Sequence, residues 1–129
     1  MWIFLNNAFL SVVADKDQDC LLVRGRIKGD IERVFPGYLV LENEGTDYRF
    51  RTVVPRRIVA GKLAEIVDDI GYKNFKGSVK DKARHDAYLR CWANMEAWQC
   101  DAEAKERTAA ARKQPQAQPT MRRKATKKL

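Results

Sequence analysis

The positive charge of this chain is concentrated at its C-terminal end. Residues 105–129 contain nine lysines and arginines and one acidic residue, Glu106, so this segment carries the whole net charge of +8 of the 129-residue chain. The first 104 residues hold 16 basic and 16 acidic side chains and are neutral. A block of like charge that is poor in apolar residues is typically a disordered interaction arm. We therefore expect a compact domain in residues 1–104, followed by a basic helical extension and disordered tail in residues 105–129.

The neutral segment is long enough for one modest hydrophobic core and no second domain. Its longest apolar runs, such as residues 8–14, fall short of the ~20 residues that cross a bilayer, so we expect no membrane protein. The N-terminus lacks the basic region of a secretory signal. Three cysteines without a CxxC pair predict reduced thiols in a cytoplasmic protein, with neither a disulfide framework nor a zinc site.

Alternating apolar and polar residues predict two β-hairpins. Residues 9–14 and 20–27 form the first, and residues 38–44 and 47–54 form the second. Each hairpin is followed by a helix. These elements predict a single α+β domain of ββα-ββα order, with helices on one face of an antiparallel four-stranded sheet.

The helix after the first hairpin is short, with Asp30 as its expected N-cap and Pro36-Gly37 after its end. The apolar spacing from Val59 to Ile70 predicts a longer helix after the second hairpin, beginning beside Pro55. Both helices have an apolar face that requires burial. We therefore expect them to cover the sheet.

A third, long helix is expected to begin near Ser78, because Ser78 and Asp81 have the spacing of a capping box. Alanines and i,i+4 ion pairs extend it to about Lys113, before Pro115 and Pro119 break it. Its apolar stripe is predicted to pack on the core. The stripe consists of Tyr88, Cys91, Met95, Trp98 and Ala102, with Trp92 beside it.

Five short motifs mark the neutral segment. They are Met1-Trp2-x-Phe4, Phe9-Leu10-Ser11-Val12-Val13, Leu22-Val23-Arg24-Gly25-Arg26, Asn74-Phe75-Lys76 and Tyr88-x-x-x-Trp92. Together they resemble a family of small uncharacterised bacterial and phage proteins, over the chain as far as about Trp98. The resemblance implies a compact α+β domain of bacterial or phage origin, without an activity to carry over.

No pattern in the chain indicates catalysis, since GxSxG, Walker A, GxGxxG and HExxH motifs are absent. His85, the single histidine, is expected to be a partly exposed structural residue. The alternating aspartates of the 15–19 turn resemble the opening of a calcium loop, but Cys20 and Arg26 stand where that loop needs Gly and Glu. We therefore expect no enzyme, no bound metal and no cofactor.

Four arginines alternate with other residues on two predicted strands. They are Arg24, Arg26, Arg49 and Arg51. If both strands belong to one sheet with helices behind it, all four guanidinium groups emerge on the open face and can bind phosphates. Sheets that bind RNA usually also present aromatic rings there, whereas the pattern places Tyr48 and Phe50 on the opposite face. The alternative is a solvated face, or one that is neutralised by nearby acids. Those acids are Glu42, Glu44 and Asp47.

The basic segment is the second candidate for binding. Cations interrupted by Gln and Pro, without bulky apolar anchors, suit a phosphate backbone better than a membrane. We therefore expect a non-catalytic protein that binds nucleic acid or a ribonucleoprotein through this segment. The alternatives are a phage-encoded inhibitor or accessory factor that docks on a host protein, and a purely solubilising segment. The candidate residues here are Arg112, Lys113, Arg122, Arg123, Lys124, Lys127 and Lys128.

Overall fold

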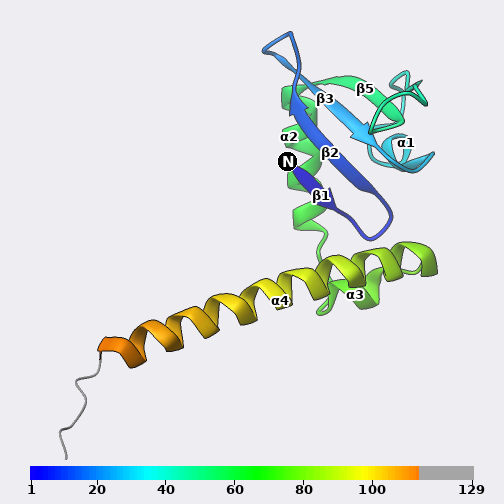
Figure 1. Ribbon diagram of the computed structural model, residues 1–129. Helices are drawn as coiled ribbons and strands as arrows, with labels where there is room; N and C mark the ends of the chain where they lie inside the picture. The colour runs from blue at the N-terminus through cyan, green and yellow to red at the C-terminus, as the bar shows by residue number, and fades with distance from the viewer. Residues whose placement is uncertain (114–129) are drawn as a thin grey trace, which may run out of the picture. The chain divides into compact units, whose positions relative to one another are not determined.

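The computed structural model describes residues 1–113 (Figure 1). The chain divides into two units between Leu89 and Arg90. The first unit contains a sheet and its helices. The second unit consists, as far as Lys113, of the remainder of the last helix. The mixed α+β class and the long C-terminal helix are confirmed.

Five antiparallel strands form the sheet of the first unit. They are β1 (Trp2–Phe4), β2 (Phe9–Ala14), β3 (Cys20–Gly25), β4 (Leu41–Glu42) and β5 (Phe50–Pro55), in the spatial order β1-β2-β3-β5-β4. β2 and β3 form the predicted first hairpin, with Val12 opposite Val23, but β3 ends at Gly25 rather than at residue 27, and Ile27 is exposed. β3 also pairs with β5, so the two hairpins share one sheet through a central β3–β5 ladder.

β1 is an edge strand that the sequence pattern does not reveal, so the prediction of four strands in ββα-ββα order was wrong. Three residues are too few to show a period of two. Pairing fixes the strand instead: Ile3 lies opposite Leu10, and two backbone hydrogen bonds join Met1 to Val12. The N-terminal amino group donates one of them, to the Val12 carbonyl at 2.7 Å.

The second hairpin is shorter than predicted. The Thr52 hydroxyl donates to the Leu39 carbonyl at 2.8 Å, so a side chain replaces the strand ladder at that point and β4 keeps only two residues. β5 begins at Phe50, three residues later than expected, because the chain from Asn43 to Arg49 is a turn closed by the Asn43 N–H and the Arg49 carbonyl. Tyr48 therefore lies outside the strand.

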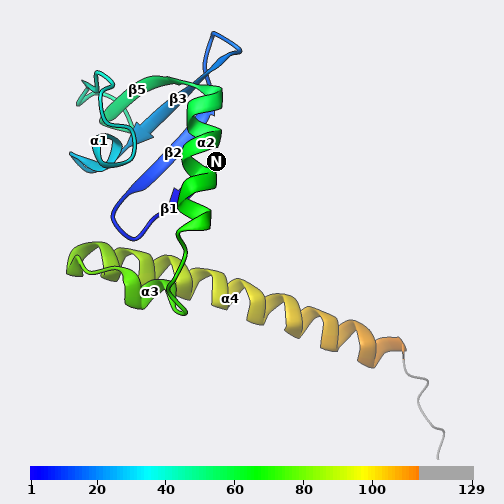
Figure 2. The ribbon, with the colours of Figure 1, turned by 180° about the vertical axis from the view of Figure 1, so that it is seen from behind.

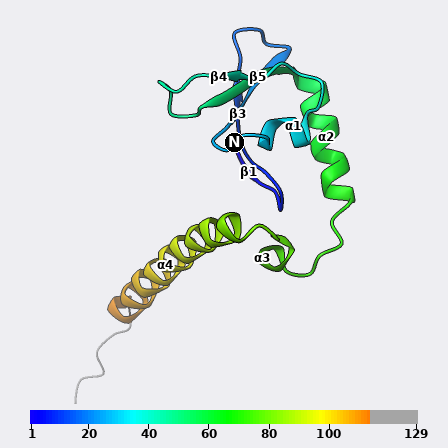
Figure 3. The same cartoon turned by 90° about the vertical axis from the view of Figure 1, so that its right-hand side faces the viewer.

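Helices α1 (Asp30–Val34) and α2 (Arg56–Asp68) pack on the same face of the sheet, as Figures 2 and 3 show. Burial alternates along β5 as predicted. Val59 of α2 is buried, but Val67 and Ile70 of the predicted apolar face are exposed, and in β2 Ser11 is buried together with both of its neighbours. The buried cluster consists of Ala8, Leu10, Val12, Val23, Ile31, Val34, Phe35, Phe50, Val54 and Val59. The other face of the sheet carries the alternate residues of each strand.

Two further helices follow, α3 (Phe75–Ser78) and α4 (Lys82–Lys113). The Asp81 carboxylate caps α4 by accepting the Arg84 backbone N–H at 2.7 Å. Ser78 belongs to α3, where its hydroxyl donates to a backbone carbonyl of its own turn, so the predicted capping box was wrong. Within the described residues, no helix is long and apolar enough to span a membrane.

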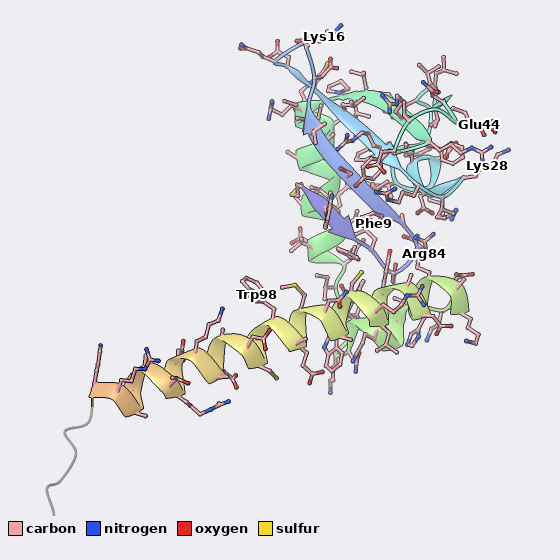
Figure 4. The ribbon with its side chains drawn as sticks, in the orientation of Figure 1. Phe9, Lys16, Lys28, Glu44, Arg84 and Trp98 are labelled. Atoms are coloured by element: carbon pink, nitrogen blue, oxygen red, sulfur yellow. The ribbon has the colours of Figure 1, made fainter. Side chains whose placement is uncertain are left out.

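Asp30 is a fully buried carboxylate at the start of α1, where it was expected to be the N-cap. Gly29 occupies the cap position instead, in the left-handed region (φ 91°) that favours glycine. The carboxylate accepts hydrogen bonds from the Phe9 N–H, from Arg33, and from both terminal nitrogens of Arg84 at 2.6 and 2.9 Å. Arg84 points from α4 toward the sheet (Figure 4). This ion pair fixes the first turn of α4 to the sheet.

Tyr88, one turn further along α4, is also buried, as predicted. Its hydroxyl lies 2.9 Å from the Leu5 and Ala8 carbonyls. The rest of the predicted stripe is exposed, so its placement in the core was wrong. The exposed fractions are 47% for Trp92, 58% for Met95 and 68% for Trp98, and Cys91 and Ala102 are exposed as well. Periodicity identifies residues that share a helix face, but it does not show that anything covers that face.

The Asp30 ion pair makes a stability prediction. Arg84→Met leaves a buried carboxylate without its main partner, so we expect unfolding in urea to require about 3 kcal/mol less free energy. Arg90→Met on the exposed part of the same helix is the matched control and should change stability by less than about 0.5 kcal/mol. Equal effects of the two substitutions would contradict the structural role of the pair.

The exposure of α4 makes a second prediction. Trp98→Ala should destabilise the protein by less than about 1 kcal/mol, because the Trp98 side chain is mostly exposed and its removal uncovers little contact area. Tyr88→Ala, on the buried part of the same helix, should cost about 3 kcal/mol. Chemical unfolding followed by circular dichroism measures both. A loss from Trp98→Ala as large as that from Tyr88→Ala would show that Trp98 is covered in solution.

Candidate nucleic-acid interface

The β3–β5 ladder places arginines directly opposite each other on the open face of the sheet. Arg24 of β3 pairs with Arg51 of β5, between the core pairs Val23–Thr52 and Gly25–Phe50. Directly opposite residues on antiparallel strands share a face, so both guanidinium groups lie on the side away from α1 and α2. The predicted open arginine face therefore exists, with Arg24 and Arg51 at its centre.

Two of the four predicted arginines are neutralised by neighbouring acids. Arg26 forms an ion pair with Asp47 at 3.1 Å, and the hydrogen bonds to Asp47 raise the pKa of its guanidinium above the ordinary value. Arg49 forms ion pairs with Glu42 and Glu44. For these two side chains, the alternative of pairing with nearby acids is the one that the structure bears out.

Arg24 and Arg51 are different, because neither has a carboxylate within 4.0 Å among residues 1–113. Arg24 Nη2 donates to Ser11 Oγ at 2.8 Å, and Arg51 Nη2 donates to the Tyr48 carbonyl at 3.3 Å. The Nε atoms of both are buried without a hydrogen-bond partner. Opposed like charges destabilise a sheet, and each unsatisfied buried donor costs about 1–3 kcal/mol. The fold therefore holds these two cations in place at a cost in stability.

The Tyr48 ring packs against two of the arginines, Arg24 and Arg26, whereas the sequence pattern placed it on the opposite face of the sheet. Its buried ring lies 4.5 Å from the Arg24 guanidinium carbon and 4.2 Å from that of Arg26. The strand alternation does not extend to Tyr48, because β5 begins at Phe50. Phe50 itself lies in the core, as predicted. The Tyr48 ring fixes the two guanidinium groups through cation–π contacts.

Aromatic side chains on the arginine face are the feature that sequence reasoning missed. Trp2 lies opposite Ser11, and Phe4 lies opposite Phe9, so all three rings project on the side of Ser11 and Arg24. The rings are neighbours: the Phe9 centroid is 6.4 Å from that of Trp2 and 4.8 Å from that of Phe4. Trp2 is 67% exposed. The sequence signal for these rings was the alternation of Trp2 and Phe4 with the core-facing Ile3. This alternation places both rings on one face only once β1 is known to be a strand.

The described part of the basic segment is the exposed end of α4 in the second unit. Lys105, Arg107, Arg112 and Lys113 are all exposed, and Arg107 approaches Glu103 to 3.9 Å. The other predicted binding residues and the predicted disordered tail lie outside the described residues. Those residues are Arg122, Arg123, Lys124, Lys127 and Lys128.

Within residues 1–113, no group of three or more His, Cys, Asp or Glu side chains could hold a metal ion. The aspartates of the 15–19 turn stabilise the turn itself, since Asp15 and Asp17 accept backbone N–H groups two residues later. His85 is partly exposed, with Nδ1 3.5 Å from Asp86 Oδ1. The partial exposure of His85 agrees with the prediction.

Comparison with protein families, curated proteins and solved structures finds no match to this chain.

The cost of the arginine pair can be measured. Arg51→Thr removes the opposed charge and the unsatisfied Nε while keeping a residue that favours strands, so we expect stability to be unchanged or raised by about 0.5–1 kcal/mol. Thermal and urea unfolding measure the change. A loss of more than about 1 kcal/mol would show that Arg51 is a structural residue.

Proposed function

We propose that this protein is a non-catalytic nucleic-acid-binding protein. One observation carries the proposal: the half-buried Arg24 and Arg51 on the sheet have no carboxylate within 4.0 Å among residues 1–113. The same holds for the exposed Lys105, Arg112 and Lys113 at the end of α4. The whole net charge of the chain lies in residues 105–129. A polyanion is the natural partner for both regions, because binding releases its condensed counterions.

The two regions contribute different chemistry. Residues 105–129 carry nine lysines and arginines that are spread along the sequence, which suits contact with several phosphates whatever the nucleic-acid sequence. The guanidinium groups of Arg24 and Arg51 are planar forks held against the sheet, which suits bidentate contact with phosphate oxygens. Arg26 and Arg49 contribute less, since each would first have to leave a carboxylate.

A second candidate function is docking on a protein partner. It is favoured by the exposed apolar residues Trp92, Met95 and Trp98 on α4, which form a patch of the kind that marks interaction sites. Such docking depends little on salt, whereas phosphate contacts weaken steeply with it. Salt dependence therefore separates the two functions.

The proposal predicts the following titration. Affinity for a mixed-sequence duplex should fall by orders of magnitude between about 50 and 200 mM salt, and neutralising five basic residues should reduce the log–log slope by about 4. The five changes to Gln are at Arg122, Arg123, Lys124, Lys127 and Lys128. Fluorescence anisotropy with a labelled duplex measures the slope.

The matched control makes the same change in net charge with five exposed cations elsewhere. They are Lys16, Lys28, Arg57, Lys73 and Arg90, each changed to Gln. This control should keep most of the slope. Absence of duplex and single-strand binding by the unmodified protein at low salt would sink the proposed function and leave protein docking in its place.

A further inference from the structure

The open face of the sheet carries a continuous row of side chains across all five strands. The register places Trp2, Ser11, Arg24, Arg51 and Leu41 opposite one another in turn, from β1 to β4. One end of the row is aromatic, the middle holds the two guanidinium groups that have no carboxylate partner, and the far end is apolar. Phe9, which Figure 4 labels, lies two residues before Ser11 on the same face of β2. Its ring centroid is 6.4 Å from that of Trp2.

We propose that this face stacks nucleobases and binds single-stranded nucleic acid. The inference rests on the proposed nucleic-acid function and names its substrate class. Aromatic rings on a sheet stack the bases of unpaired strands, and each stacked base is worth about 1–3 kcal/mol. The bases of a duplex are already stacked on each other, so a ring on a flat sheet face adds nothing to duplex binding.

The aromatic rings and the guanidinium groups are spaced so that one single strand of nucleic acid can contact both at the same time. Neighbouring strands are about 4.8 Å apart, so the Trp2 and Arg24 backbones are separated by about 10 Å across β2. The hydrogen bond to Ser11 Oγ brings the Arg24 side chain back over β2, toward Trp2. A base on the Trp2 ring therefore places its sugar–phosphate backbone beside the Arg24 guanidinium.

The charges of this face favour nucleic acid over a protein surface as the ligand that covers it. An apolar protein patch laid over Trp2 and Leu41 would bury Arg24 and Arg51 without a counter-charge, which is strongly unfavourable. The occupant must therefore offer flat apolar faces and anionic oxygens in alternation. A single strand of nucleic acid offers both along its whole length.

The exposed Trp2 ring provides the most direct test. Trp2→Leu keeps an apolar side chain on β1 but removes the aromatic face, so affinity for an unstructured pyrimidine strand should fall about tenfold. Affinity for a duplex of the same length should stay within about twofold, because its contacts are electrostatic. Trp2→Phe should restore most of the loss. Anisotropy with the full chain and labelled oligonucleotides measures all three.

The arginines are tested in the same assay. Arg24→Gln and Arg51→Gln should each weaken single-strand binding at least fivefold, or about 1 kcal/mol, while Arg57→Gln on α2 is the matched control and should leave it unchanged. Thermal unfolding of each variant confirms that it is folded. If Trp2→Leu does not fold, the folded Arg24→Gln and Arg51→Gln variants test the same face, and a loss of single-strand affinity no greater than their loss of duplex affinity would overturn it.

The possible outcomes are distinguishable. One outcome is that changing the five C-terminal cations lowers single-strand and duplex affinity equally, while Trp2→Leu and Arg51→Gln have no effect. This outcome would overturn the stacking face and leave the proposed function standing. Absence of binding to either nucleic acid would overturn both. A selective loss of single-strand binding in the Trp2 and Arg51 variants supports the stacking face.

Discussion

A fully buried carboxylate, Asp30, connects three segments that are far apart in the sequence. It accepts the backbone N–H of Phe9 in β2 and both terminal nitrogens of Arg84 in α4, and it is itself the first residue of α1. A buried charge is tolerated only when its partners remain in place, so the strand, the short helix and the start of the long helix are fixed together. Because the Phe9 backbone is hydrogen-bonded to Asp30, this cluster also fixes the position of the Phe9 ring on the open face of the sheet.

The same sheet separates the demands of stability and binding between its two faces. The face under α1 and α2 holds the aliphatic core around Val12 and Val23. The other face opposes Arg24 and Arg51, leaves their Nε atoms without partners and exposes Trp2. Each of these three features lowers the stability of the sheet or leaves an apolar ring in water. They fit the proposed binding of an anionic ligand whose bases stack on aromatic rings.

Strong local periodicity made parts of this fold predictable. The β2–β3 hairpin and α2 follow from patterns confined to a few neighbouring residues. β1 has only three residues and depends on pairing with β2, which a local pattern does not contain. The exposure of Trp98 was missed for a related reason, since a helical stripe carries no information about what covers it. Of the candidate site, the arginine face was predicted and the acids that could pair with it were named, whereas which arginines are paired, and the aromatic rings beside them, required the structure.

The most direct test of the account is a two-dimensional amide and side-chain NMR titration of the full chain with an unstructured pyrimidine strand at moderate salt. The account predicts that the Trp2 indole N–H and the Arg24 and Arg51 Nε–H signals shift together with the amides of β1 and β2, in addition to signals from residues 105–129. Shifts confined to residues 105–129, with the Trp2 indole and both arginine signals unmoved, would contradict it.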